Sequence, residues 1–504
     1  MASLANAPAP APTRTPIILF TGLLVVCSVF SAPVRAQAGQ PEERQWRVLL
    51  HSHADLAGGL RMGVRLQQAA AARDIDAVIL TEQLLTDWQW APPVIRRIWN
   101  YRRRETSIRT FGIQRYFRRV AELDAAVPEV TLMAGAEVAP YYRWTGAPWK
   151  GNLTMWDWQR NILVLGLPSA DDYARLPVTG LRRLPVESVR DVPWLATLII
   201  FLLLSLFALR NRNRVWAAVL AVPVLLLIHS GPPPPQPFPV YRDSTPTEAY
   251  QALIDSVRAR GGFSLWTQIE AVDDHPYSWG LIHTDPHPQV LVETTGYDAF
   301  GSLYPATSTA REPGREWDRA LADYLAGHRD DPVWGWGELA LHYPEQIEVK
   351  NAKRVDGVLS VVLAPDRTPG ALLEALRTGR GYALLAALPG GHLRLETFEA
   401  TAGEKRAGSG GTLSTSGAVA VRAGVSFTGS EPPLLRVRLI RSGEVVIDRE
   451  LVPPVSLEFT DFGPEESETA AWYRLLVHSQ AHHVISNPIF VRYGTAMNAK
   501  GTQP

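Results

Sequence analysis

The chain has 504 residues and carries 50 basic and 50 acidic side chains, so its formal net charge is zero. This length predicts two to four domains, and the balanced charge gives no reason to expect nucleic acid as a partner. The single cysteine, Cys27, lies in an apolar N-terminal run, which excludes disulfides and thiolate metal sites from the rest of the chain.

Residues 1–38 are typical of a secretory signal peptide. Arg14 precedes the apolar run, and Ala36, Gln37 and Ala38 form a small-x-small cleavage site. The alternative is an uncleaved segment that anchors the chain in a membrane. In both cases we expect the bulk of the chain on the extracytoplasmic, periplasmic side.

A buried strand is predicted over Trp46–Leu50, and it ends at His51 and His53. Side chains two apart on a strand share a face, so the two imidazoles can converge on one metal ion. A helix over Gly63–Arg73 and a second strand over Asp76–Leu80 follow. This strand, helix, strand order favours an α/β sheet or barrel with its chemistry at the C-terminal ends of the strands.

An insert over 84–160 combines arginines between residues 96 and 119 with tryptophans between residues 88 and 158. Three interpretations stay open: a solvated helix face with core tryptophans, contact with anionic lipid headgroups, or single-stranded nucleic acid. Within and after the insert, strands are predicted over Val130–Glu137, which ends in a carboxylate, and Asn161–Leu167.

Residues 191–231 contain two apolar runs separated by Arg210, Arg212 and Arg214. Neither run shows an amphipathic stripe, which favours a transmembrane helical hairpin with its arginine loop in the cytoplasm. The alternative is a buried helical hairpin of a soluble protein.

Helices and strands alternate again over 232–388. Helices are predicted over Thr247–Arg260, Trp317–Gly327 and Gly370–Gly379, and a strand over Gln289–Glu293. From 389 to 496 short alternating strands predict a β-sandwich, and 497–504 is expected to be a disordered tail.

In their order, these strand ends resemble the PHP family (polymerase and histidinol phosphatase domain), in the metallohydrolase branch with a C-terminal β domain. The matching stretches are His51 and His53, Gly135-Ala136-Glu137, Ala375–Tyr382, Trp472–Arg474 and Asn487–Val491. The resemblance implies an α/β fold: a distorted (βα)7-type barrel over 39–190 and 232–388, interrupted by the transmembrane hairpin and followed by the β-sandwich.

Several family ligand positions are altered in this chain. The Thr-Asp-His of the family is replaced by Thr81-Glu82-Gln83, a histidine by Asn161, and an Ala-His-Pro by Thr267-Gln268-Ile269. The closing Asp-x-His resembles Ala340-Leu341-His342. Because a carboxamide oxygen is a poor ligand for zinc, iron or manganese, these changes argue against a trinuclear site.

The remaining candidate metal ligands are His51, His53, Glu137 and His342, which could hold one divalent ion (zinc, manganese or iron), or none. Glu82 or Asp55 is the candidate general base. Replacement ligands could come from Asp273-Asp274-His275 and from His283, Asp285 and His287.

The predicted function is that of an exported, membrane-anchored, metal-dependent hydrolase that cleaves a phosphoester, or a related ester or amide, in a small-molecule or phosphorylated substrate. Its partner would be the lipid bilayer. The alternative is a catalytically inactive barrel that acts as a membrane-bound ligand-binding or scaffold protein.

Overall fold

The computed structural model describes residues 43–91, 101–179, 192–230, 238, 240–241, 243–306, 308–342, 353–387, 389–463 and 469–494. The predicted signal peptide at 1–38 and the predicted tail at 497–504 lie outside these residues.

Seven strands form the first part of a 15-stranded sheet, in the order β13-β12-β9-β8-β5-β2-β1. Most neighbours run parallel, but β8 is antiparallel to both β5 and β9. The bounds are Arg44–Ser52 (β1), Ala77–Gln83 (β2), Thr131–Val138 (β5), Ile162–Leu165 (β8), Phe263–Trp266 (β9), Ala299–Leu303 (β12) and Trp334–Gly337 (β13).

The chain after β13 returns to β1. Ser52 and Leu341 form a parallel bridge, and the amide of Leu339 donates to the carbonyl of Leu50 at 3.0 Å. The first and last strands of the run are therefore neighbours, and their C-terminal ends meet at one place.

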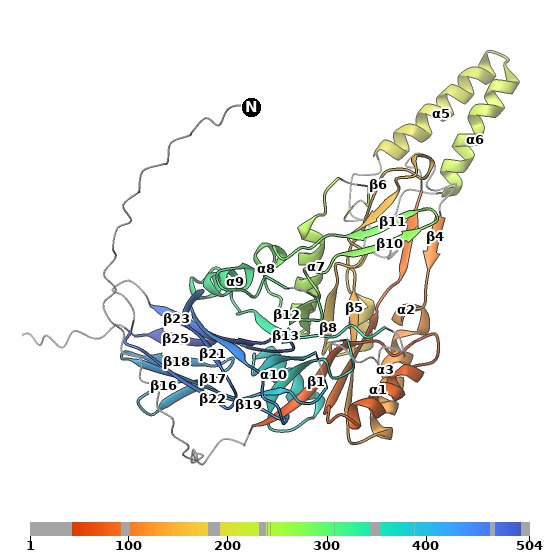
Figure 1. The fold of residues 1–504 in the computed structure, drawn as a ribbon. Coiled ribbons are helices and arrows are strands. Elements are labelled where there is room, and N and C mark those ends of the chain that lie inside the picture. Colours follow the sequence, from red (N-terminus) through yellow and green to blue (C-terminus); the bar gives the residue numbers. More distant parts are fainter. Residues whose placement is uncertain are drawn as a thin grey trace, which may run out of the picture.

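Helices cover the outer face of this run of strands (Figure 1). The apolar side chains of Thr247–Arg258 show why: Tyr250, Leu253, Ile254 and Val257 recur on one face and are buried against β9. The helix bounds are Arg61–Ala71 (α1), Ile108–Phe111 (α2), Ile113–Ala126 (α3), Ala170–Ala174 (α4), Thr247–Arg258 (α7), Val290–Glu293 (α8), Glu316–Leu325 (α9) and Pro369–Arg377 (α10).

The second half of the large sheet continues directly from β1 through β14, β15, β24, β23, β20 and β21, and β18 and β25 pair beside it. A separate sheet of β17-β16-β19-β22 packs on its face. The bounds are Val358–Ala364 (β14), Gly381–Ala386 (β15), Leu393–Ala402 (β16), Lys405–Gly408 (β17), Thr412–Thr415 (β18), Val419–Phe427 (β19), Leu435–Arg441 (β20), Glu444–Leu451 (β21), Val455–Asp461 (β22), Ala470–His478 (β23), His482–Ser486 (β24) and Ile489–Tyr493 (β25).

The arginine- and tryptophan-rich insert forms the small sheet β3-β4 and contributes β6 and β7 to a second small sheet, β10-β11-β7-β6, whose other two strands come from residues 273–284; the two sheets share a cluster of buried tryptophans. Arg102 and Arg104 pair with the buried Asp87, and Arg103 lies 5.0 Å from the ring centre of Tyr277. The arginines of β4 therefore have partners within the protein, although their side chains stay largely solvent-exposed. The bounds are Asp87–Trp90 (β3), Tyr101–Arg104 (β4), Arg143–Thr145 (β6), Thr154–Trp156 (β7), Asp273–Tyr277 (β10), Gly280–Thr284 (β11) and, beside them, the single turn Pro148–Lys150 (η1).

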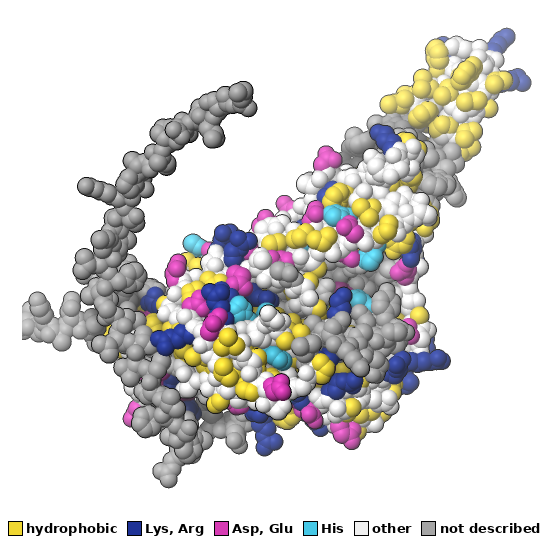
Figure 2. Space-filling view, viewed as in Figure 1, with side chains coloured by type: hydrophobic (Ala, Val, Ile, Leu, Met, Phe, Trp, Pro, Cys, Tyr) yellow, Lys and Arg dark blue, Asp and Glu magenta, His cyan; other side chains and the backbone are white. Residues whose placement is uncertain are grey.

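Residues 192–230 form a helical hairpin, Val192–Arg210 (α5) and Arg214–Ser230 (α6), which projects from the rest of the molecule with apolar side chains on its surface (Figures 1 and 2). None of the helices in the described part of the chain is both long and apolar enough to cross a membrane. At 1.5 Å per residue, α5 and α6 span only about 28 and 26 Å, short of the roughly 30 Å of a hydrocarbon core. The predictions of a transmembrane hairpin at 191–231, and of the membrane-anchored location that depended on it, are therefore wrong.

The predicted fold class is wrong in a second respect. The sequence suggested a barrel followed by a separate β-sandwich, whereas β14 and β15 join the two parts into one mixed sheet. The boundary expected near residue 389 therefore interrupts neither the hydrogen-bonded sheet nor the buried cores, since each of the two large cores contains residues from both sides of it.

A buried ion pair also links the two halves. Arg474 on β23 donates from Nε and Nη2 to the two carboxylate oxygens of Asp318 on α9, each at 2.8 Å. Both side chains are almost inaccessible to solvent, and the guanidinium lies 4.9 Å from the ring centre of Trp317. Two buried charges in this arrangement compensate one another.

Removing one partner leaves the other charge buried. We expect Arg474→Met to lower the free energy of unfolding by about 3–5 kcal/mol, and the double variant Arg474→Met, Asp318→Asn to cost less. Urea denaturation of both variants measures this. The matched control is Arg436→Met, which breaks the exposed pair with Asp448 and should shift the midpoint little. An equal effect of the single and double variants would contradict the account.

Asp298 precedes β12, and its carboxylate accepts a hydrogen bond from the amide of Ser264 at 2.7 Å. Burial raises the pKa of Asp298 to about 6, although this hydrogen bond opposes the shift. The folded protein therefore binds this proton more tightly than the unfolded chain does, so stability should fall as pH rises from about 4 to about 6. We expect Asp298→Asn to remove up to about 3 kcal/mol of this pH-dependent change in the free energy of unfolding. The free energy of unfolding of the parent chain and the variant, measured against pH, tests this.

Candidate metal centre

His51 and His53 lie at the C-terminal end of β1, and both imidazoles are buried. The strand is not regular there: His51 has φ 68°, in the left-handed region, and the pairing of β1 with β2 shifts register between Leu49 and Ser52. The irregular backbone brings the two rings to a centroid distance of 5.7 Å. Such backbone strain at a strand end is typical of functional sites.

Glu137, near the end of β5, faces both imidazoles. Its Oε1 lies 3.4 Å from Nε2 of His51, and its Oε2 lies 3.4 Å from Nε2 of His53. The three residues are buried, and one ligand atom from each lies within 4.8 Å of the others. His51, His53 and Glu137 together could hold a metal ion.

Two side-chain amides orient the Glu137 carboxylate. Asn161 donates from Nδ2 to Oε1, and Gln83 donates from Nε2 to Oε2, both at 2.5 Å. Asn161 and Gln83 stand at positions where the family resemblance expects histidine ligands. In this chain they are hydrogen-bond donors to the carboxylate.

Glu338, directly after β13, was not predicted from the sequence. It is fully buried, and its Oε2 lies 3.0 Å from Nδ1 of His51. Its Oε1 accepts a hydrogen bond from the amide of Gln268 at 2.6 Å. The signal for it was a carboxylate at a strand end, as at Glu137, because Glu338 directly follows the last residue of β13.

The other predicted site residues lie around this group. Glu82 is buried, bonds the amide of Ala54, and places Oε2 3.5 Å from Nδ1 of His53. His342 is exposed and stacks on His53 at a centroid distance of 4.3 Å, but it is not one of the three clustered residues. Asp55 is exposed and accepts a hydrogen bond from the amide of Gly58 at 2.9 Å, which stabilises a turn.

The carboxylates around the two imidazoles determine whether His51 and His53 are protonated. Burial alone lowers the pKa of His51, but the adjacent carboxylates of Glu137 and Glu338 outweigh it and raise the pKa to about 10. The pKa of His53 is also raised, because Glu137 and Glu82 oppose the effect of burial. Burial raises the pKa of Glu137, but the two imidazoles more than offset this and hold it well below its usual range. In the absence of an ion, charged imidazoles thus compensate buried carboxylates.

The proposed replacement ligands lie on the β10–β11 hairpin and the segment after it. His275 is paired with Asp273, and His283 lies between Asp274 and Asp285, with Nε2 2.9 Å from the Asp285 carboxylate. None of these residues belongs to the group of His51, His53 and Glu137. His287 is buried, which lowers its pKa to about 3, and Arg160 adds to that shift.

Comparisons with known proteins leave the family open. Neither a family model nor a curated protein matches the chain. Among solved structures, one match is the crystal structure of an engineered protein, with 15% identity over 40% of this chain and 43% of that chain, and a TM-score of 0.14. A likeness at this level carries no argument, so the resemblance to the PHP family stays a prediction.

The position of Glu338 depends on Gly301 of β12. A Cβ atom at Gly301 would lie 1.8 Å from Oε1 of Glu338, so no larger residue fits without displacing that carboxylate.

We expect Gly301→Ala to lower the unfolding free energy by about 2 kcal/mol or more, because Glu338 would lose its bonds to His51 and Gln268. Gly370→Ala is the control: a Cβ at Gly370, in α10, meets open space, and it should stabilise the helix by up to about 1 kcal/mol. Thermal and chemical denaturation compare the two variants. Equal stability of Gly301→Ala and the parent chain would show that the carboxylate is not fixed by this contact.

Proposed function

We propose that the chain is a metal-dependent hydrolase of the PHP type, with one divalent ion bound by His51, His53 and Glu137. The observation that carries this proposal is the state of the two Nε2 atoms. Both are buried, neither has a hydrogen-bond partner among the residues that the structure describes, and both face Glu137 at 3.4 Å. A buried, unpartnered imidazole nitrogen is costly unless it binds a ligand.

The opposite ring nitrogens support the same assignment. Nδ1 of His51 lies 3.0 Å from Glu338, and Nδ1 of His53 lies 3.5 Å from Glu82. Metal-binding histidines commonly direct their second nitrogen to a carboxylate, which fixes the ring and the tautomer and makes the free nitrogen a better ligand. Glu82 and Glu338 are therefore assigned as positioning residues for the two imidazoles.

A divalent ion held by His51, His53 and Glu137 would keep open coordination positions and would activate a water molecule as a nucleophile at neutral pH. The residues of this chain keep the site dry and rigid, since Glu137 is fixed by Asn161 and Gln83. His342 is exposed and stacks on His53, so we assign it to the solvent side of the proposed site. The reaction that the family resemblance implies is hydrolysis of a phosphoester or a related ester or amide.

One observation favours a second function, a ligand-binding or scaffold protein without catalysis. Both oxygens of Glu137 already accept amide hydrogens, and the raised pKa values of His51 and His53 let the charges balance without an ion. The metal content of the protein separates the two functions.

We expect the full chain, stripped with a chelator and reloaded with zinc, manganese or iron, to retain close to one ion per molecule. His51→Ala and His53→Ala should each reduce retention by at least tenfold, about 1.4 kcal/mol, because each removes one of three ligands. Elemental analysis after gel filtration measures the ion, and aryl phosphate mono- and diesters test hydrolysis. The matched control is His275→Ala on the β10–β11 hairpin, which should retain the ion.

Two outcomes would overturn the hydrolase. One is a chain that retains no ion and whose melting temperature is unchanged by chelation. The other is ion retention that survives both substitutions. The first outcome supports the ligand-binding or scaffold protein.

A further inference from the structure

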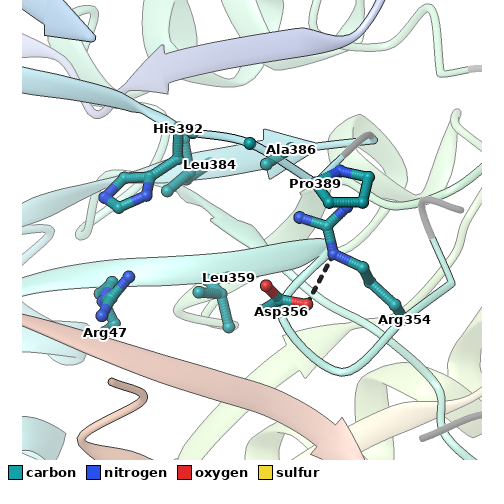
Figure 3. A pocket seen from close by; sticks show the side chains of 10 residues that line it. Arg47, Arg354, Asp356, Leu359, Leu384, Ala386, Pro389 and His392 are labelled. Atoms are coloured by element: carbon teal, nitrogen blue, oxygen red, sulfur yellow. Dashed lines mark hydrogen bonds and ion pairs between the residues drawn. The ribbon is translucent and has the colours of Figure 1, made fainter. Parts of the chain in front are cut away.

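A cavity separate from the candidate metal centre lies where the two halves of the molecule meet. It consists of two adjoining spaces of about 150 Å³ and about 270 Å³, and Arg47, Leu384 and His392 line both of them. Arg47 comes from β1, Leu384 from β15, and His392 from the loop before β16, as Figure 3 shows for the smaller space. Arg47 precedes His51 by four residues on the same strand, which is roughly 13 Å of chain, so the cavity is separate from the metal centre.

The lining of the two spaces is cationic. Arg47, Arg354 and Arg394 contribute three guanidinium groups, and among the described residues that line the two spaces Asp356 is the one carboxylate. Arg47 and Arg394 also have acidic neighbours outside the lining, Asp74 and Glu396, each at 3.3 Å. Those two carboxylates are solvent-exposed, so their compensation of the arginines is screened by water.

Arg354 is the decisive side chain. It is 8% exposed, and its Nε donates to Asp356 at 2.6 Å (Figure 3). Its Nη1 is buried and has no hydrogen-bond partner among the described residues. An unsatisfied guanidinium nitrogen in a buried position is costly, and an anion in the cavity would satisfy it.

The loop that closes the smaller space is built for close approach. Gly391 has φ 149°, and a Cβ there would lie 2.6 Å from the backbone nitrogen of Gly429. Thr428 accepts a hydrogen bond from the backbone amide of His392 at 2.9 Å, which holds this part of the loop at the cavity wall. The site is therefore shaped by both halves of the chain and is not an accident of one surface loop.

We propose that this cavity binds a small soluble molecule through a phosphate group. Arginine forks match the geometry of phosphate oxygens and bind them with charge-assisted hydrogen bonds. The smaller space suits the phosphate beside Arg354, and the larger space, lined by Tyr382 and Arg394, suits the remainder of the molecule. Because β1, β15 and β16 all contribute, an occupied cavity would stabilise the contact between the two halves.

Inorganic phosphate tests the proposal on the full chain. Titration calorimetry at constant ionic strength should show saturable binding to one site in the millimolar range or tighter, and the melting temperature should rise with phosphate concentration. Arg354→Gln should weaken binding about tenfold or more, because it removes a charged donor. Arg394→Gln, in an exposed position, should also weaken it and gives an answer if Arg354→Gln does not fold.

Two further variants locate the site. Arg422→Gln removes an exposed arginine on β19 that pairs with Glu458, and His51→Ala alters the metal centre; both should bind phosphate like the parent chain. Loss of binding in His51→Ala would place the phosphate at the metal centre and overturn the proposal. Absence of saturable binding, or equal binding by the parent and the Arg354 and Arg394 variants, would also overturn it.

Discussion

A buried carboxylate is stable only when hydrogen bonds and opposite charges replace the water that it has lost, and Glu137 imposes that requirement on the site. It takes an amide hydrogen at each oxygen, from Asn161 and Gln83, and it faces an imidazole at each oxygen, from His51 and His53. These groups and Glu137 itself lie at the ends of four neighbouring strands. The C-terminal ends of β1, β2 and β5 and the N-terminal end of β8, which runs antiparallel to β5, must therefore meet at one place for the charge to be tolerated.

The strands that end at the candidate metal centre could be predicted from the sequence, because the end of a strand can be recognised without an alignment. An apolar run that stops at a histidine or a glutamate marks both the strand and the residue at its end, as at His51 and Glu137. The strand predicted over Gln289–Glu293 is instead helix α8. The apolar run between Pro288 and Thr294 is too short for its hydrophobic periodicity to distinguish a helix from a strand. Sequence alone also could not show that Asp55 bonds within its own turn and points to no shared site.

The altered ligand positions were harder to interpret than the two histidines and the glutamate on which the prediction of a metal site rests. The amides at 83 and 161 are poor metal ligands, and the sequence indicated only that a larger metal set was unlikely. The structure shows what they do instead, because each donates a hydrogen bond that fixes Glu137. Glu338 escaped prediction since its partner, His51, lies 287 residues earlier, and only the return of the chain from β13 to β1 brings them together.

Because β14 and β15 are hydrogen-bonded into one sheet with the C-terminal strands, a truncation near residue 389 would break that sheet. A chain cut at the change in composition near residue 389 would leave β15 without β24 and expose a row of unpaired amides and carbonyls. Such an open strand edge is a template for pairing with other copies, so the isolated N-terminal fragment would aggregate. Expression of either half alone would thus report on a broken sheet and not on an independent unit.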